Sequence, residues 1–152
     1  MPKPCVLVSA CFIGCHCRYD GRSNQIPEIA ELARKYGWIP ICPEILGGLT
    51  TPRTPSERCG ERVIAKDGKD VTDAFERGAE EACFLAKLYN AKYALLKERS
   101  PSCGTGIIYD GTFTGTRVPG FGVTAQKLNA LGIRTFGESR LKELLNLLEE
   151  EK

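Results

Sequence analysis

Four short apolar runs divide the chain, and each is followed by glycine, proline or polar residues. They lie at residues 5–10, 38–41, 93–96 and 133–136. Runs of this length, rich in branched and aromatic side chains, are typical of strands buried in a sheet. The longer segments between them place apolar residues three and four positions apart, which is typical of helices that cover a sheet on one face.

Helices are expected at residues 27–36, from 70 or 72 to about 88, at 123–131 and at 139–148. Asp70 or Thr72 is expected to cap the longest helix and Ser139 the last one, whose acidic tail we expect to fray. Because strands alternate with helices, the sheet should be parallel with right-handed crossovers. The sequence therefore predicts an α/β fold: a Rossmann-like three-layer domain with a mainly parallel sheet of about four strands and flanking helices.

Three segments lie outside this alternation. Residues 42–60 are rich in proline and contain the pair Gly47-Gly48, so they are predicted to form a long loop of the kind that is often functional or mobile. Residues 63–65, with a turn at 67–68, predict a short hairpin or edge strand. Residues 107–113 predict a small hairpin that turns at Asp110-Gly111.

Length and charge limit the function classes. With 152 residues the chain suits one domain spanning residues 1–152. A formal net charge of +2 is too small to indicate a nucleic-acid polymer or an anionic membrane as partner. No stretch is apolar for long enough to span a bilayer, and the first strand starts too early to leave room for a signal peptide. We therefore expect a cytoplasmic protein with a small-molecule substrate; its oligomeric state stays open, a homodimer included.

The chain contains eight cysteines, which is many for its length. A secreted disulfide framework does not fit the strand–helix alternation or the missing signal peptide. In a reducing compartment, cysteines indicate a metal, catalysis or small buried side chains. No Cys-x-x-Cys occurs, which excludes zinc ribbons and thioredoxin-type motifs.

Three cysteines follow predicted strands: Cys11, Cys42 and Cys103. If the strands are parallel, their thiols meet at the carboxyl end of the sheet, where open α/β folds bind ligands. Each cysteine alone could be a buried small side chain, but three thiolates converging on one cleft favour a metal centre. Cys15 and Cys17 could be spare ligands or could only fill a loop.

Polar residues beside these cysteines are candidates for acid–base chemistry. Glu44 follows Cys42 by two residues and could act as general acid or base next to a metal. Ser100 and Ser102 flank Pro101, so either could relay a proton or simply form the turn.

Loop residues could bind an anionic substrate. Arg18, Arg53 and Arg117 lie in predicted loops and could form bidentate hydrogen bonds to an anion, or be ordinary solvated side chains. The backbone amides of residues 120–122, which precede a helix, are a further, weak candidate for an anion site. His16, the only histidine, could be a metal ligand but is expected to be an exposed loop residue.

Several short motifs together resemble the thiouracil desulfidase family, and they follow the same order over nearly the whole chain. They are Val8-Ser-Ala-Cys11, Arg18-Tyr-Asp-Gly21, Cys42-Pro-Glu44, Thr51-Pro-Arg53, Asp70-Val-Thr72, Ser100-Pro-Ser-Cys-Gly104 and Gly106-Ile-Ile-Tyr-Asp-Gly111. In that family a Rossmann-like domain holds a four-iron four-sulfur (4Fe-4S) cluster through three cysteines and removes sulfur from thiouracil or related thionucleobases without net redox chemistry.

The resemblance implies that Cys11, Cys42 and Cys103 ligate the cluster and that Glu44 and Ser100 are the catalytic acid–base residues. We place substrate binding at four further residues: Ser102, Arg18, Arg53 and Gly104.

The expected reaction is hydrolysis of the thiocarbonyl to uracil and sulfide. An iron without a protein ligand would bind the thiocarbonyl sulfur as a Lewis acid, Glu44 would deprotonate the attacking water, and Ser100 would shuttle a proton. Two alternatives stay open: a module that binds iron–sulfur or zinc without turnover, and a metal-free enzyme with a cysteine nucleophile. The substrate could be a free base, a nucleoside or a nucleotide.

Overall fold

A four-stranded parallel sheet forms the centre of the computed structural model, which describes residues 4–151. Its strands are β1 (Cys5–Ser9), β2 (Gly37–Ile41), β5 (Tyr93–Leu96) and β8 (Arg134–Gly137), in the order β2-β1-β5-β8. All three neighbouring pairs are parallel, with Val6 opposite both Trp38 and Tyr93. The sequence prediction of a parallel α/β sheet of four strands is confirmed.

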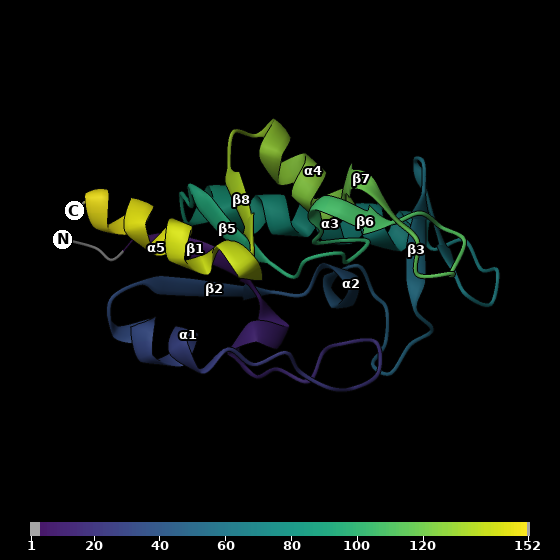
Figure 1. Ribbon diagram of the computed structural model, residues 1–152, viewed down its shortest axis with the longest axis horizontal. Coiled ribbons are helices and arrows are strands. Elements are labelled where there is room, and N and C mark those ends of the chain that lie inside the picture. Colours follow the sequence, from purple (N-terminus) through teal and green to yellow (C-terminus); the bar gives the residue numbers. More distant parts are fainter. Residues whose placement is uncertain (1–3, 152) are drawn as a thin grey trace.

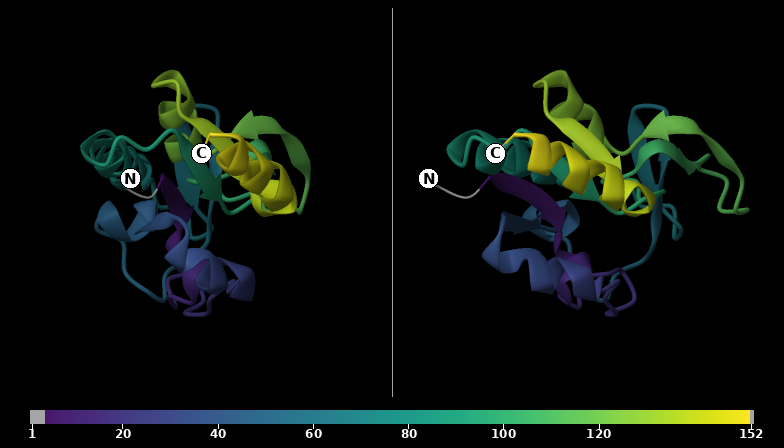
Figure 2. Two further views of the ribbon diagram at one scale, coloured as in Figure 1. Left: turned by 90° about the vertical axis from the view of Figure 1, so that its left-hand side faces the viewer. Right: turned by 60° about the vertical axis from the view of Figure 1, so that its left-hand side comes forward.

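Helices cover both faces of this sheet (Figures 1 and 2). The helices on one face are α1 (Pro27–Glu31), which continues as a 3-10 turn at Leu32–Arg34, and α5 (Leu141–Glu150); those on the other are α3 (Thr72–Leu88) and α4 (Val123–Ala130). Strand β1 alternates between the two cores, since Val6 and Val8 pack with α1 and α5 whereas Leu7 packs with α3 and α4. Figure 2 shows α1 and α4 on opposite sides of the sheet in both views.

The predicted loop at residues 42–60 is not one continuous loop, so that prediction is wrong in part: residues 47–55 have no regular structure, whereas the segments on either side of them do. It contains a short helix, α2 (Pro43–Leu46), and strand β3 (Ser56–Cys59), which pairs antiparallel with β4 (Arg62–Ala65). The β3–β4 hairpin turns at Gly60, whose φ is +62°. The predicted strand at residues 63–65 with a turn at 67–68 is confirmed, since Gly68 N–H donates to Ala65 O at 2.8 Å and Ile64 forms an antiparallel bridge with Asp70. Pro43 suits the first turn of α2 because a proline there loses no helical hydrogen bond.

A second hairpin is wider than predicted. Strand β6 (Thr105–Tyr109) pairs with β7 (Arg117–Phe121), so Asp110-Gly111 lies inside the connecting loop. The carboxylate of Glu57 accepts the backbone N–H groups of Gly111 and Phe113, which fixes this loop to the first hairpin. Both hairpins lie beyond the carboxyl ends of the sheet strands (Figure 1).

Three predictions about helix ends also need correction. Ser139 does not cap α5; it lies in the 3-10 turn Glu138–Arg140, and its hydroxyl donates to Glu98 at 2.8 Å. The acidic tail is tied down, because the Tyr36 hydroxyl donates to Glu149 at 2.9 Å. Neither Asp70 nor Thr72 caps α3 as predicted: the N-cap residue is Val71, without a side-chain capping hydrogen bond, and the Asp70 carboxylate instead accepts the backbone N–H and the hydroxyl of Thr72, the first residue of the helix.

Candidate metal centre and active site

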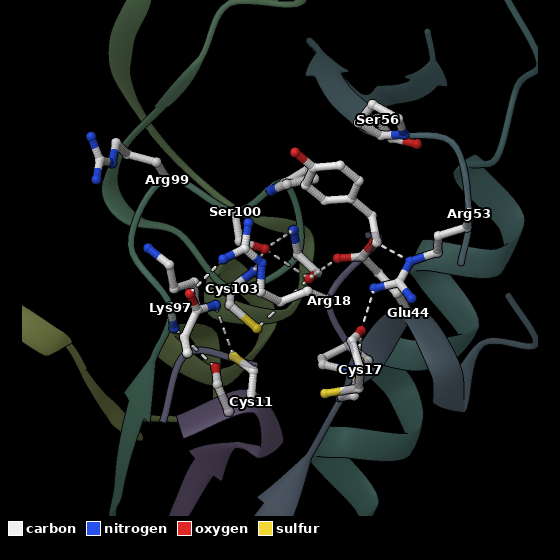
Figure 3. Close-up of a pocket in the computed structure, with 18 of the residues that line it drawn as sticks. Cys11, Cys17, Arg18, Glu44, Arg53, Ser56, Lys97, Arg99, Ser100 and Cys103 are labelled. Atoms are coloured by element: carbon white, nitrogen blue, oxygen red, sulfur yellow. Dashed lines mark hydrogen bonds and ion pairs between the residues drawn. The ribbon is translucent and has the colours of Figure 1, made fainter. Parts of the chain in front are cut away.

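A cavity of about 610 Å³ opens at the carboxyl end of the sheet (Figure 3). Segments that follow three of the parallel strands contribute to its wall: Cys11 follows β1, Cys42 follows β2, and Cys103 follows β5. The parallel order of the strands brings these positions together, although 92 residues separate the first from the last along the chain. No disulfide joins any of the eight cysteines, all of which lie within the described residues.

Each of the three thiols has a different environment. Burial raises the pKa of Cys11 and raises that of Cys103 to about 12. A hydrogen bond from the Cys17 side chain is the main reason that the pKa of Cys42 is lowered to about 7, while the pKa of Cys17 itself is raised. The electrostatic influence of Cys42 on both Cys11 and Cys103 indicates that the three sulfurs face one region of the cavity.

The three thiols line a cavity, whereas the ligands of a single metal ion must all lie within bonding distance of one atom. Sulfurs on one tetrahedral zinc ion would lie about 3.8 Å apart, because each Zn–S bond is about 2.3 Å long. Among residues 4–151, no three His, Cys, Asp or Glu side chains gather closely enough to hold a single ion. Soft thiolate ligands spread around a cavity fit an iron–sulfur cluster better than zinc.

Glu44 lies in the first turn of α2, and its side chain is 16% exposed. One carboxylate oxygen accepts a hydrogen bond from Arg53 Nε at 3.0 Å, and the other accepts one from Ser102 Oγ, also at 3.0 Å. Arg53 is 8% exposed and also donates to the carbonyl oxygen of Cys17 at 2.9 Å. Arg53 therefore orients the carboxylate and ties α2 to the loop that contains Cys17.

Ser102 lies between Ser100 and Glu44. Its hydroxyl is buried, 3.0 Å from Ser100 Oγ and 3.6 Å from Cys103 Sγ. Ser100 Oγ accepts the backbone N–H groups of Ser102 and Cys103, at 3.2 and 3.0 Å. The three side chains thus form one continuous hydrogen-bonded chain from Ser100 to Glu44.

The first turn of α4 holds the segment that contains these serines. The backbone N–H of Val123 donates to Pro101 O and that of Thr124 to Ser102 O, both at 2.9 Å. Gly122 N–H donates to Gly104 O at 2.9 Å. The prediction that amides of residues 120–122 could bind an anion is not supported at this point, because the helix start is occupied by the protein's own carbonyl groups.

Residues 6–140 match the 2-thiouracil desulfurase family. The chain belongs to this family. A solved structure described as a 4Fe-4S-dependent thiouracil desulfidase, TudS, is 45% identical to the chain and superposes with a TM-score of 0.93; the match covers 97% of this chain and 99% of that one. The uncharacterized protein YbbK of Bacillus subtilis (strain 168) is 39% identical over an alignment of 150 residues that covers 92% of this chain and 99% of YbbK.

In this member of the 2-thiouracil desulfurase family, the predicted site residues divide into those that line the cavity and those that do not. The cavity wall includes Cys11, Cys42, Cys103, Glu44, Ser100, Ser102, Arg18 and Arg53. Gly104 lies behind the wall, where its N–H donates to Ser100 O at 2.8 Å and a Cβ would lie 2.7 Å from that oxygen. Its contacts are those of a residue that closes the turn.

Of the two further cysteines in the first loop, Cys17 lines the cavity, whereas Cys15 is exposed and lies outside it. His16 and Arg117 are exposed, as expected for His16.

Sequence reasoning missed Asn24 and Lys97, which also line the cavity. Asn24 Nδ2 donates to Cys11 Sγ at 3.5 Å, and Lys97 forms an ion pair with Glu138 at 2.8 Å. Asn24 is three residues beyond the Arg18-Tyr-Asp-Gly21 motif, and no periodicity marks it. Only the fold of the loop brings it back to Cys11.

Proposed function

We propose that the protein is an iron–sulfur-dependent desulfidase that removes sulfur from thiouracil or a related thionucleobase or thionucleotide, yielding the oxygen analogue and sulfide without net redox chemistry. The family membership and the 45% identity to a protein described as a 4Fe-4S-dependent thiouracil desulfidase support this activity. The observation that carries it is the cavity in which thiols from three separate strands meet the chain of Ser100, Ser102 and Glu44.

Cys11, Cys42 and Cys103 would hold the cluster. Held by these three residues, a cluster would supply an iron without a protein ligand, whose chemistry would be to bind the soft sulfur of a thiocarbonyl and polarise the carbon–sulfur bond. Burial raises the pKa of the Cys11 and Cys103 thiols, so a cationic partner is needed before both can ionise at neutral pH. The iron atoms would provide that charge.

Glu44 would accept the proton of the water that attacks the thiocarbonyl carbon. Its Oε2 accepts a hydrogen bond from Ser102 in the resting arrangement. A hydroxyl has one proton, so Ser102 must then accept the proton of Ser100 in their 3.0 Å contact. Once Glu44 is protonated, this chain can reverse, and Ser100 can donate to a ring nitrogen of the substrate.

The direction of these hydrogen bonds, from Ser100 through Ser102 to Glu44, assigns different roles to the two serines. Ser100 borders the cavity and is the group that would exchange a proton with the substrate. Ser102 is 1% exposed, so we assign it to relaying the proton between Ser100 and Glu44 in place of direct substrate binding.

The cavity favours a substrate that carries negative charge. Its wall carries five cationic side chains against three carboxylates, and an excess of cationic side chains in a cleft attracts anions. The cationic side chains are Arg18, Arg53, Lys66, Lys97 and Arg99, and the carboxylates are Glu44, Glu57 and Glu98. Its volume of about 610 Å³ leaves room for more than a pyrimidine ring. We therefore place a thionucleotide ahead of the free base and expect Arg18 to contact it.

Location and partners follow from the same chemistry. No helix in the described part of the chain is long and apolar enough to cross a membrane. Thiolate ligands require a reducing environment, which supports a cytoplasmic location for this protein. A single-domain organisation, the lack of a nucleic-acid partner and a homodimer stay predictions.

The test is anaerobic reconstitution with iron and sulfide, followed by measurement of sulfide released from thiouracil and from thiouridine 5′-monophosphate. We expect Cys103→Ala to lose both the iron content and the activity. Cys15→Ala is the matched control in the same protein, because Cys15 is exposed and outside the cavity.

Glu44→Gln separates proton transfer from cluster binding. It should keep the iron content and lose activity by about 10²–10⁴-fold, the usual contribution of a general base. Full activity of Cys103→Ala would remove the cluster from the mechanism, and full activity of Glu44→Gln would remove the carboxylate.

A further inference from the structure

The side chain of Asn24 connects the cavity wall to the sulfur of Cys11. Asn24 Nδ2 lies 3.5 Å from Cys11 Sγ, and Asn24 Oδ1 accepts a hydrogen bond from Arg18 at 2.9 Å. Arg18 is held in turn by Asp20 at 3.0 Å. Figure 3 shows Arg18 and Cys11 among the residues that line the cavity.

The contact with Arg18 fixes which way the carboxamide points. A guanidinium group has only N–H donors, so the atom it contacts must be the amide oxygen. The NH₂ group then faces Cys11, and the sulfur can only accept. The orientation therefore follows from donor and acceptor chemistry alone.

The backbone holds this arrangement from the other side. Asn24 N–H donates to Cys11 O at 2.9 Å, and Ile26 N–H donates to Phe12 O at 2.7 Å. Two successive links thus fix the segment of Asn24 alongside the turn that carries Cys11. These backbone hydrogen bonds hold the Asn24 side chain beside the Cys11 sulfur.

The other two sulfurs have donors of a different kind. Cys103 Sγ accepts from the hydroxyl of Ser9, while Ser102, at 3.6 Å, directs its proton to Glu44. Cys42 Sγ accepts from the Cys17 thiol, a weak donor, and from the backbone N–H of Ile45. Asn24 is the side chain that supplies an N–H group to one of these three sulfurs.

We propose that Asn24 is a positioning residue that tunes the iron–sulfur cluster through its hydrogen bond to Cys11; this rests on the function proposed above. A donor to a ligand sulfur withdraws charge from it and stabilises the more negative, reduced state of the cluster. The same withdrawal makes the iron a stronger acceptor for a substrate sulfur. Arg18 fixes the orientation of the donor, so a residue expected to contact the substrate also acts on the cluster ligand.

The experiment measures the reduction potential of the reconstituted full-length protein by redox titration, at equal iron and sulfide content. Two variants lack the donor: Asn24→Leu, which is close in shape, and Asn24→Ala. Asn24→Gln keeps an amide on a longer stem. Asn129→Ala is the control, because Asn129 accepts a hydrogen bond from Thr135 at the surface, away from the cavity.

Both donor-lacking variants should have a lower reduction potential than the wild-type protein, while Asn24→Gln should recover part of the difference and Asn129→Ala should show none. A potential equal to that of the wild type in a donor-lacking variant that carries the cluster would overturn the inference. Loss of the cluster from both donor-lacking variants would also overturn it, since Asn24 would then be a structural residue. A wild-type protein that takes up no cluster would instead overturn the proposed function.

Discussion

The position of α2 depends on two glycines, and this gives a test of how the site is built. Gly47 and Gly78 allow α2 to pack directly on α3: a Cβ on Gly78 would lie 1.8 Å from Pro43 O, and one on Gly47 would lie 1.9 Å from Ala74 O. Real Cβ contacts essentially never fall below 3.0 Å, so Gly78→Ala must move α2 by at least about 1.2 Å. Cys42 and Glu44, on either side of Pro43, would move with it.

The two effects of Gly78→Ala on stability oppose each other. Alanine inside a helix is more stable than glycine by about 0.5–1 kcal/mol, whereas overpacking costs about 1–3 kcal/mol. The net destabilisation should therefore be about 0–2.5 kcal/mol, which leaves the protein folded. Activity should fall much further, because a displacement of about 1 Å in a reacting group can reduce the rate by about 10²-fold.

The assay compares sulfide release with thermal unfolding for Gly78→Ala and for Glu81→Ala, an exposed position on the same helix. We expect Glu81→Ala to keep its activity and Gly78→Ala to lose about 10²-fold while still unfolding cooperatively. Wild-type activity in Gly78→Ala would refute the reasoning, since it would mean that α2 can move without disturbing the site.

Three further predictions concern single contacts. In the iron-free protein, Cys42 has a pKa of about 7, so its alkylation rate, followed by mass spectrometry, should rise as the pH increases through 7 and more of the thiol ionises. Cys17→Ala removes the hydrogen bond that lowers this pKa. If the pKa of Cys42 then returns near 9.0, alkylation at pH 7 should be about 50-fold slower. An unchanged rate in Cys17→Ala would contradict the hydrogen bond. Ser102→Ala should keep its iron content but lose about 10²-fold or more in sulfide release, and an active variant would exclude the relay. Tyr36→Phe loses the hydrogen bond to Glu149, worth about 1 kcal/mol, so the midpoint of its thermal unfolding should fall by about 2–4 °C. An unchanged midpoint would mean that this contact does not hold the end of α5.

Much of the fold could be predicted because its strands are short apolar runs with clear ends. The run at residues 93–96 coincides with β5, and the other three parallel strands differ from their predicted ranges by one residue at one or both ends. That parallel order was enough to predict that residues 11, 42 and 103 meet, because carboxyl ends of parallel strands share one edge.

Residues 42–60 could not be predicted in the same way. The segment has no period of its own: α2 spans only four residues, and β3 becomes a strand by pairing with β4. Its conformation depends on contacts that are distant in sequence, such as Gly47 against Ala74 and Arg53 against Cys17 O. The same reason explains why Asn24 was missed.

The distance between the carboxylate and the serines is set by packing on both sides of α3. On one side, Gly47 and Gly78 bring α2 and Glu44 onto α3. On the other side, α4 packs against α3, with Lys127 paired to Glu76 at 2.7 Å, and the start of α4 binds the segment of Ser102.

Gly122 completes this arrangement, since a Cβ there would lie 2.4 Å from the carbonyl carbon of Ser102. The 3.0 Å contact between Glu44 Oε2 and Ser102 Oγ therefore depends on close backbone packing on both sides of α3, of α2 on one side and of α4 on the other. Since both ends of that hydrogen bond are fixed by backbone packing, the two groups are preorganised for proton transfer before any substrate enters, and no movement of either segment is needed to complete the chain.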